Sequence, residues 1–501
     1  MSQQPLLTDD KTGHASFDVV RRLQAQVREF GACSLPGVSI DYLRFMPIMW
    51  KAVSRGFVSH ENAAFVSCGL WHGFDCGLDV SLLKGRRRYR NYKSALEGRS
   101  RVSKATRVRV GNQKTLMLCG VPSGYDVASL GPLIPFDHWR IFPIGAVPKP
   151  LEPEELRPVS DHSKTGLKEA TVDLRLKHTL TAVEDIEREF KFAYSMIVGD
   201  VDAAYPLLPL AWWVWKYFMF VWFDVREPDE ATGAELFLYM HVCGDFGTSG
   251  LPGTFKIFFT DVVVNMARSE LVLTLPMPIF VDDMGLIGAV TAALRREWEA
   301  LKVFLRELGV PLKELKERLE NVRQLMLGFW WDSIQRTRTL DRPKLEQYIA
   351  MFDDFSRRKT LSLTEMQSSS GRMQRACMTL PPGSNCMLAS VYALMSGLTL
   401  GFQKRRTTRV VRADFAGVRD LLQQNMGRGY FSYDRFQRAP RVWSDASKSR
   451  RYTGGGYVSE CGAYRWWTYG GSAAREPIDF LEGDAVVLAA QDLGAGWYRC
   501  V

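Results

Sequence analysis

Apolar residues recur along the chain in the two periods that distinguish helices from strands. Helical spacing runs through residues 17–30 and through residues 291–308, TAALRREWEALKVFLREL, which Gly309 and Pro311 follow. Because glycine and proline terminate helices, both stretches are predicted as helices. A shorter helix is expected over residues 184–195, and residues 336–440 are predicted to be mostly helical, with a break at the Pro-Pro-Gly of residues 381–383.

Short apolar runs bounded by turn residues predict strands. MIVGD at residues 196–200 is expected to be a buried strand, and PIFVDDMGLI at residues 278–287 is expected to be a hairpin with Asp282 and Asp283 at its turn. A second tight hairpin is expected at residues 327–333, LGFWWDS. The aromatic run at residues 211–225 contains Lys216 and is too short to span a membrane, so we expect buried strands there. The C-terminal segment is expected to form strands around a glycine turn at residues 454–456.

Composition indicates a folded protein with two to four domains. The 501 residues are 46% hydrophobic and 24% charged, and the net charge of +10 suits a polyanionic partner. Nine cysteines without regular spacing favour a reducing compartment. No secretory signal opens the chain, so we expect an intracellular protein, cytoplasmic or nuclear, without membrane segments. Cys68, His72 and Cys76 are spaced like zinc ligands, but buried thiols are the favoured interpretation.

A basic stretch covers residues 84–109, with eight arginines and three lysines against one acidic residue, Glu97. Arg86, Arg87, Arg88 and Arg90 are interleaved with tyrosines, a pattern in which guanidinium groups pair with phosphates and aromatic rings stack on bases. The alternative is a solvated basic loop. We favour a nucleic-acid contact because the cluster is dense and almost free of acidic residues.

The candidate chemistry is carried by acidic residues. Asp282 and Asp283 are adjacent and repel each other, and a divalent cation such as Mg²⁺ between them would reverse that repulsion. Asp200, at the end of a predicted strand, is a third candidate ligand. A surface turn that happens to carry two aspartates is the alternative. Lys149 and Arg157 lie on a predicted hairpin, and their charges suit a triphosphate.

Five motifs in one order resemble the reverse transcriptases of retroelements. FPIGAVPKP followed by LRPVSD resembles the fingers hairpin, and GDVDAAY resembles the first catalytic motif. FGTSGLPGTF resembles the template-facing motif, FVDDM the catalytic hairpin and LGFWWDS the primer-gripping hairpin. The resemblance covers about residues 143–333. It implies an α+β right-hand polymerase with fingers, a palm with an antiparallel sheet, and a thumb or connection.

The resemblance also implies a role for each matching residue. Two Mg²⁺ or Mn²⁺ ions would be held by Asp200, the main chain of Val201, Asp282 and Asp283. Tyr205 would exclude a 2′-hydroxyl, Lys149 and Arg157 would hold the triphosphate of a dNTP, and Phe246 and Gly247 would contact the nascent base pair. Lys316 is the candidate proton donor to pyrophosphate, with Lys313 as the alternative. Gly328, Phe329 and Trp330 would grip the primer.

The remaining segments resemble other parts of the same elements. Residues 362–396 resemble the connection of tyrosine-recombinase (DIRS-type) and related retroelements. The C-terminal piece resembles an α/β ribonuclease H with Asp445 and Glu482 in place, but two of the usual four carboxylates predict no competent ribonuclease H. The expected domains are an N-terminal extension (1–80), fingers and palm (81–335), thumb or connection (336–440) and a partial ribonuclease H-like domain (441–501).

The sequence therefore predicts an RNA- and DNA-directed DNA polymerase of a retrotransposon, acting on a template–primer. The alternative is a catalytically silent remnant that only binds nucleic acid.

Overall fold

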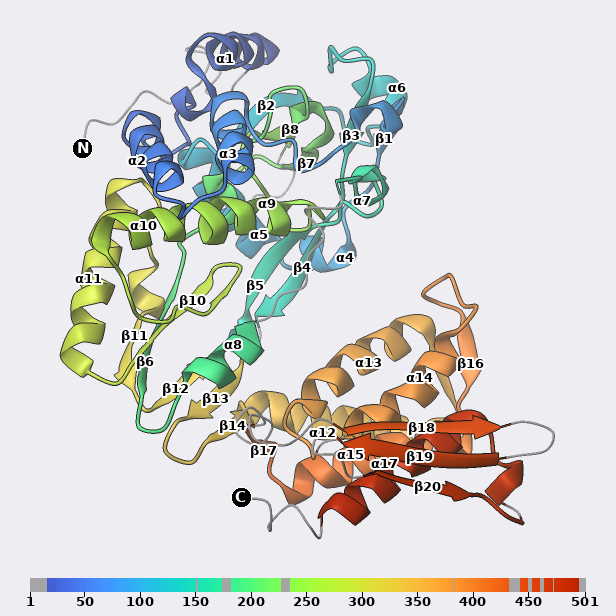
Figure 1. Cartoon of the computed structure of the whole chain (residues 1–501). Coiled ribbons are helices and arrows are strands. Elements are labelled where there is room, and N and C mark those ends of the chain that lie inside the picture. Colours follow the sequence, from blue (N-terminus) through green and yellow to red (C-terminus); the bar gives the residue numbers. More distant parts are fainter. Residues whose placement is uncertain are drawn as a thin grey trace. The chain divides into compact units, whose positions relative to one another are not determined.

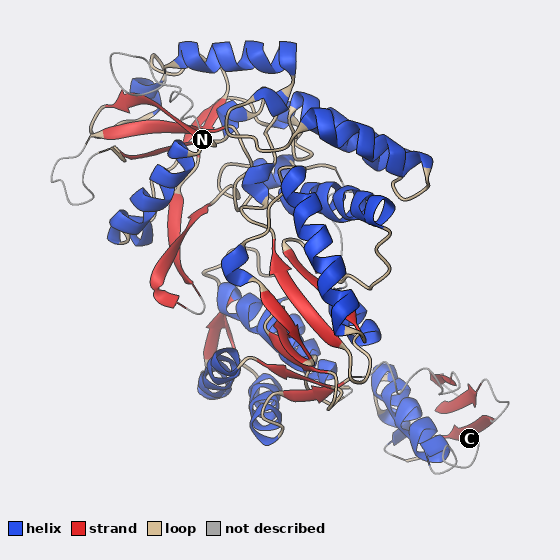
Figure 2. Ribbon diagram, turned by 90° about the vertical axis from the view of Figure 1, so that its left-hand side faces the viewer, coloured by secondary structure: helices blue, strands red, loops and turns tan. Residues whose placement is uncertain are grey.

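The computed structural model describes most of the chain, and its residues form two compact units, Met1–Tyr430 and Phe431–Val501. The described residues are 16–149, 152–173, 182–226, 235–381, 383–431, 442–448, 453–459, 464–471 and 473–494. Figure 1 labels the helices and strands of both units. Figure 2 shows that the strands of the first unit are divided among several small sheets with helices between them. Within the described ranges, no helix is long and apolar enough to cross a membrane.

Three helices begin the first unit: α1 (Phe17–Phe30), α2 (Tyr42–Ser54) and α3 (His60–His72). The expected helix over residues 17–30 is confirmed. Asp41 and Ser59 start α2 and α3, because their side chains accept hydrogen bonds from main-chain N–H groups that have no partner within the helix. The buried faces of these helices belong to the same hydrophobic core as the strands around residues 197–221.

The possible zinc motif is divided by the end of α3. Cys68 is exposed on the helix, whereas Cys76 lies beyond Gly73 and is buried, which raises the pKa of its thiol. The expectation of buried thiols is therefore confirmed for Cys76 and wrong for Cys68, which lies on the solvent side of the helix. Nowhere in the described ranges are three or more His, Cys, Asp or Glu side chains arranged to hold a metal ion.

A five-stranded sheet has the order β1-β3-β7-β8-β2, so β1 forms one edge. Its strands are β1 (Arg86–Arg88), β2 (Thr115–Val121), β3 (Trp139–Ile141), β7 (Met219–Phe223) and β8 (Leu236–His241). Three short helices accompany it: α4 (Lys93–Glu97), α5 (Arg99–Gly111) and α6 (Val127–Leu130). The strand prediction for residues 211–225 is correct only for β7, because residues 215–217 form a 3₁₀ turn that buries Trp215 and Tyr217.

An antiparallel hairpin of β4 (Ile144–Lys149) and β5 (Glu152–Ser160) follows the edge of this sheet, as expected. After α7 (Leu167–Ala170), the predicted helix at residues 184–195 is present as α8 (Ala182–Glu189). It is shorter than expected because residues 195–200 are recruited into the next sheet as β6.

The sheet that carries the acidic residues has the order β11-β6-β10-β9. Its strands are β6 (Ser195–Asp200), β9 (Ile279–Phe280), β10 (Asp283–Gly288) and β11 (Arg318–Asn321). The predicted helix over residues 291–308 is α11 (Thr291–Glu307), which packs against this sheet. Gly199 permits that packing, since a Cβ there would lie 2.7 Å from the Trp298 ring. A continuous helical segment runs through α9 (Leu251–Phe255), a π-helical stretch (Lys256–Val263) and α10 (Val264–Leu271).

A second four-stranded sheet contains the hairpin predicted at residues 327–333. Its order is β12 (Arg323–Met326), β13 (Phe329–Asp332), β14 (Thr337–Leu340) and β17 (Arg428–Tyr430). The region after it is mostly helical, as expected: α12 (Arg342–Arg357), α13 (Leu363–Cys377), α14 (Met387–Met395) and α15 (Arg409–Gln424). A small ladder joins β15 (Thr360–Ser362) to β16 (Lys404–Arg406).

The described residues of the second unit form an antiparallel sheet, a 3₁₀ turn (Ala473–Arg475) and a helix. Strands β18 (Val442–Lys448), β19 (Thr453–Ser459) and β20 (Tyr464–Thr468) pair in sequence order, and α17 (Ile478–Gly494) packs on them. The glycines at 454–456 were expected in a turn, but they lie inside β19. A side chain at Gly455 would meet the Trp467 ring at 3.0 Å, so the absence of a Cβ makes room for that ring.

Candidate active site

The register of β6 and β10 brings two of the predicted acidic residues together. Asp283 is the cross-strand partner of Asp200, and the pairing continues without a break to Gly288 opposite Ser195. Directly opposed residues of an antiparallel pair project from the same face, with Cβ atoms about 4.5–5.5 Å apart. Asp282 is joined to the end of β6 through its carbonyl oxygen, which accepts a hydrogen bond from the Val201 N–H at 2.9 Å.

The turn between β9 and β10 is tight and strained. Phe280 pairs with Asp283, so only Val281 and Asp282 lie between the strands. The hairpin is present as expected, but its turn lies one residue earlier than predicted, because Asp283 already pairs as the first residue of β10. Val281 has φ +59°, a left-handed conformation that is unfavourable for a β-branched residue. Its side chain packs against the main hydrophobic core, and that packing offsets part of the strain. The left-handed residue, Val281, is thus the one that directly precedes the two aspartates.

Asp282 and Asp283 lie in an environment that disfavours their negative charge. Burial raises the pKa of Asp282, and the positive charge of Arg157 opposes this only in part. The pKa of Asp283 is raised to about 6, first by burial and then by the negative charge of Asp282. Arg318 and Lys344 oppose the shift without cancelling it. The corner therefore has a deficit of positive charge that a cation would correct.

The ammonium group of Lys316 contacts the third carboxylate, that of Asp200. Asp200 is only 4% exposed, and its Oδ2 atom is contacted by the Lys316 Nζ atom, which a 3₁₀ turn (Glu314–Lys316) brings to the end of β6. Lys313, the alternative considered from the sequence, touches Asp200 only through its main chain, where its N–H donates to the Asp200 carbonyl at 2.8 Å. The ammonium group supplies the positive charge that this buried carboxylate needs.

The fit of a divalent ion depends on this lysine. The three aspartates offer oxygen donors, which Mg²⁺ and Mn²⁺ prefer, and the strand register fits a shared ion. Their side chains do not form a ready metal group in the described part of the chain. Because Asp200 is engaged by Lys316, the third ligand becomes available only when the ammonium moves away.

An aromatic and basic group of Arg157, Tyr205 and Phe246 lies beside the aspartate corner, the place where Asp200, Asp282 and Asp283 meet. The rings of Tyr205 and Phe246 meet edge to face with centroids 5.0 Å apart, and the Arg157 guanidinium lies 5.8 Å from the Phe246 centroid. Burial, together with the charge of Asp282, raises the pKa of Tyr205 to about 12. Residues from three separate segments therefore lie beside the aspartates. Lys149 ends β4, and its side chain lies outside the described residues.

Gly247 is required by its contacts. Its φ is +104°, and a Cβ at this position would lie 2.2 Å from the Ser160 carbonyl oxygen at the end of β5. No side chain fits there, so the glycine lets the loop of residues 245–250 pack directly on the base of the β4–β5 hairpin.

Asp245 anchors this loop and was not identified as a candidate from the sequence. Its buried carboxylate contacts Arg109 from α5 and accepts a hydrogen bond from the Ser160 hydroxyl, and it lies 3.3 Å from Nε2 of His241. Burial alone would raise the pKa of Asp245, but Arg109 and then His241 hold it well below the usual range. Burial also lowers the pKa of His241 to about 4, so this ring is neutral. An acidic residue in a stretch rich in glycine and apolar residues was the signal that could have identified Asp245.

The hairpin of β12 and β13 is only partly as expected. Leu327 and Gly328 form its turn with φ values of +55° and +72°, and Trp330 is half-buried, with its Nε1 donating to Asp341 at 3.0 Å. Phe329 was expected to contact nucleic acid, but its ring is completely buried under the Arg375 guanidinium. It faces inward because alternate residues of β13 point to opposite faces. Phe329 therefore supports the hairpin.

Asp445 and Glu482, which were expected from the sequence to be ribonuclease H residues, are both exposed and belong to different elements of the second unit. Asp445 lies on β18, in one cross-strand row with Gly456 and Trp466, and Glu482 lies on α17. The neighbour of Asp445 on the strand, Ala446, is buried, so the two side chains point to opposite faces of the sheet.

Comparison with known proteins adds a similarity of fold. The sequence matches no family model and no curated protein. Among solved structures, a foamy viral protease-reverse transcriptase dRH in complex with ds DNA is similar with a TM-score of 0.49 and 13% identity, covering 91% of this chain and 73% of that chain. The foamy viral protease-reverse transcriptase with an RNA/DNA hybrid gives 0.49 and 12%, covering 91% and 56%. With dsDNA it gives 0.47 and 13%, covering 91% and 87%.

Proposed function

We propose that this chain is a template-directed DNA polymerase of the reverse transcriptase type, as encoded by retroelements. The observation that carries the proposal is the cross-strand pairing of Asp283 with Asp200, with Asp282 bonded to Val201 beside them. Three carboxylates from two sequence regions far apart meet at one corner, where burial and mutual repulsion leave a need for positive charge.

Asp200, Asp282 and Asp283 would hold Mg²⁺ or Mn²⁺. When bound, such ions supply charge neutralisation for the attacking 3′-hydroxyl and the phosphates of the incoming nucleotide. The chain itself positions the reactants. Lys316 is the residue that would give a proton to the leaving pyrophosphate once its ammonium has left Asp200, because that ammonium lies beside the corner.

The aromatic and basic group would select and orient the nucleotide. The Tyr205 ring packs against Phe246 and against Phe255, whose ring centroid lies 6.0 Å away. These contacts hold the tyrosine ring in place, where it would exclude a 2′-hydroxyl on the sugar of the incoming nucleotide. The exposed Arg157 is available for the triphosphate, and Lys149 is the partner expected from the sequence. The buried Asp245 and Arg109 pair holds the loop that carries Phe246 and Gly247.

Primer extension tests the proposal. Oligo(dT) annealed to poly(rA) or poly(dA) is incubated with dTTP and Mg²⁺, and we expect incorporation by the parent and its loss in Asp282→Asn/Asp283→Asn. Asp354→Asn removes one exposed carboxylate from α12 and is expected to extend like the parent. Equal incorporation by the parent and the double variant would contradict the proposal.

A second candidate is a protein that binds nucleic acid without polymerising. The contact of Lys316 with Asp200 favours it, because an ammonium that never leaves would keep the third metal ligand engaged. This candidate predicts binding of template–primer that weakens steeply with salt, without extension in either Mg²⁺ or Mn²⁺. Extension by the parent in either metal would exclude it.

A further inference from the structure

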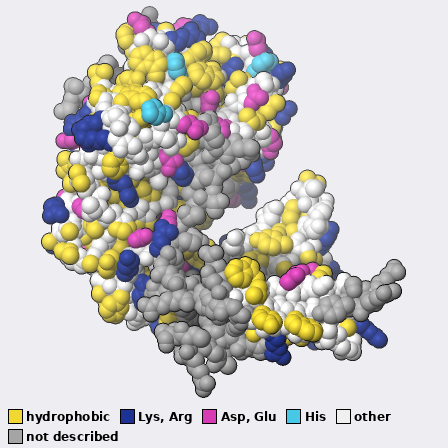
Figure 3. All heavy atoms as spheres, viewed as in Figure 1, with side chains coloured by type: hydrophobic (Ala, Val, Ile, Leu, Met, Phe, Trp, Pro, Cys, Tyr) yellow, Lys and Arg dark blue, Asp and Glu magenta, His cyan; other side chains and the backbone are white. Residues whose placement is uncertain are grey.

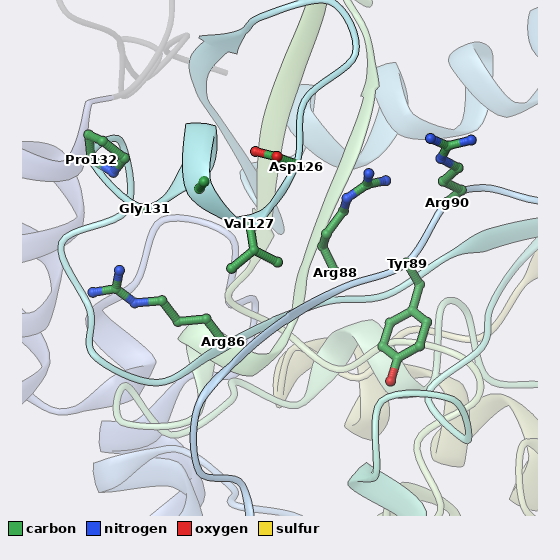
Figure 4. Close-up of a pocket in the computed structure, with 9 residues that line it drawn as sticks. Arg86, Arg88, Tyr89, Arg90, Asp126, Val127, Gly131 and Pro132 are labelled. Carbon is green, nitrogen blue, oxygen red and sulfur yellow. The ribbon is translucent and has the colours of Figure 1, made fainter.

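A broad hollow lies on the first unit between the edge strand β1 and the short helix α6 (Figure 4). Its volume is about 1060 Å³, just above the range of about 300–1,000 Å³ typical of ligand sites. Nine residues line it: Arg86, Arg88, Tyr89, Arg90, Asp126, Val127, Ala128, Gly131 and Pro132. Three of the nine are arginines and one is acidic, so the hollow suits an anionic ligand.

The arginines of this hollow are available to a ligand. Among the described residues, neither Arg86 nor Arg90 is paired with a carboxylate, and both are exposed. Arg88 is half-buried, with its guanidinium 5.0 Å from the Tyr125 ring centroid, so its position is fixed. On the face of the molecule drawn in Figure 3, Lys and Arg side chains lie in small separate groups rather than in one continuous patch. Three arginines within five residues of the chain, Arg86, Arg88 and Arg90, line this one hollow.

The directions of the side chains favour an unpaired strand over a duplex. Figure 4 shows Arg88 and Arg90 pointing to one side of the segment and Tyr89 pointing to the other. A nucleic-acid strand could place its phosphates on the arginines and one base on Tyr89. That base would have to point away from the neighbouring bases of its own strand. Bases in a duplex are stacked and paired, so their faces are not available to a tyrosine ring.

An edge strand rich in arginine has a structural explanation as well, because charge on an edge discourages pairing with other chains. That explanation accounts for Arg86 and Arg87 on β1. It does not account for the hollow, for Arg90 beyond the end of the strand, or for Tyr89 between the charges. Asp126, whose carboxylate starts α6 by accepting a hydrogen bond from the Ser129 N–H at 2.7 Å, adds an acceptor for base amino groups.

We propose that this hollow binds single-stranded nucleic acid, with phosphates on Arg86, Arg88 and Arg90 and a base on Tyr89. Its use for the unpaired part of a template rests on the proposed polymerase function. The binding itself does not, because no residue of the hollow belongs to the aspartate corner.

Fluorescence anisotropy of the full chain in EDTA tests the binding without any polymerisation. The probes are labelled oligo(dT), labelled oligo(rU) and a blunt DNA duplex. Arg86→Gln/Arg90→Gln is expected to weaken the binding of both single strands about tenfold and to reduce the slope of log affinity against log salt by about 1.4, as for two lost phosphate contacts. The matched control, Arg22→Gln/Arg296→Gln, removes two exposed arginines from α1 and α11 and is expected to change the affinity by less than about twofold.

The tyrosine gives a second, independent test. Tyr89→Leu keeps apolar bulk and is expected to weaken single-strand binding about tenfold, whereas Tyr89→Phe keeps the ring and is expected to bind like the parent. Equal losses in the hollow and control variants would overturn the proposal, and so would an equal loss of duplex binding. Binding of poly-glutamate with the same dependence on Arg86, Arg90 and Tyr89 would overturn it too, in favour of an acidic protein partner.

The hollow and the polymerase proposal can fail separately. A parent that binds oligo(dT) through the hollow but extends no primer would contradict only the proposed function. A parent that extends primers while Arg86→Gln/Arg90→Gln binds single strands normally would contradict only the hollow.

Discussion

Asp283 lies directly opposite Asp200 across β10 and β6. Both faces of this strand pair are packed, because the neighbours Leu286 and Ile287 of β10 and Met196 and Ile197 of β6 are almost completely buried. A slip of β6 by one residue would bring a residue with a side chain against the Trp298 ring in place of Gly199. The packing of the two faces therefore holds the two carboxylates opposite each other.

Asp283→Asn is expected to stabilise the protein when divalent ions are absent. A carboxyl whose folded pKa is raised to about 6 binds protons more readily in the folded state, so its ionisation costs stability as the pH rises from about 4 to about 6. Allowing for its partial exposure, removing the charge should raise the free energy of unfolding at neutral pH by about 1–2 kcal/mol. Urea unfolding in EDTA measures this.

The same variant should lose its response to metal. We expect Mg²⁺ to raise the melting temperature of the parent more at pH 7.5 than at pH 5, because protons and Mg²⁺ compete for this carboxyl. Asp354→Asn, on exposed α12, is the control and should respond like the parent. A parent without any Mg²⁺ response at either pH would contradict the metal site.

Lys316→Met is expected to make the protein depend on a divalent ion. Without the ammonium group, the buried Asp200 is left without its charge partner, and because the lysine side chain is half exposed the loss should cost about 1–3 kcal/mol in EDTA. Mg²⁺ should restore more stability to the variant than to the parent, since the ion no longer has to displace a lysine. Thermal melts over a Mg²⁺ titration measure both effects.

Lys313→Met provides the matched control. Its side chain is exposed, and only its main-chain N–H contacts Asp200, which the substitution leaves in place. If both lysine variants respond to Mg²⁺ in the same way, the contact of Lys316 with Asp200 does not control access of the ion.

Gly247→Ala should displace the loop that carries Phe246. The left-handed φ and the 2.2 Å approach of a Cβ to the Ser160 carbonyl oxygen predict a loss of about 1–3 kcal/mol and a raised KM for dNTP. Gly371→Ala tests glycine replacement without either constraint, because it lies inside α13 with no atom within 4 Å of the added Cβ. That variant should gain about 0.5–1 kcal/mol, and matching losses in both would refute the argument.

His241 should make the first unit sensitive to mild acid. Its folded pKa of about 4 lies below its ordinary value of 6.5, so the unfolded chain binds a proton first as the pH falls. Stability is thus lost between about pH 6.5 and pH 4, by about 3 kcal/mol for full protonation. Urea unfolding across this range should show a flatter pH dependence for His241→Gln, and equal slopes would contradict the burial of a neutral ring.

The sequence was informative wherever local pattern decided the structure. Helix α11 is predicted by apolar spacing and a glycine stop, and the Asp282 and Asp283 hairpin by two apolar runs around a polar pair. It was misleading where tertiary packing decided. Phe329 looks exposed by its place in a hairpin motif, yet Arg375 from α13 covers it. Residues 454–456 look like a turn, yet Trp467 from the neighbouring strand needs the space.

By itself, the sequence determined which side chains carry charge, which short apolar runs form the strands that hold the aspartates, and that a helix follows them up to Gly309. These properties depend on neighbours in the chain. Only the tertiary structure decided that Lys316 contacts Asp200, that Arg109 and His241 surround Asp245, and that the arginines of β1 border a hollow with α6. Those contacts join residues far apart in sequence. Their energies arise only when burial removes water, because a charge without water is costly unless it is paired.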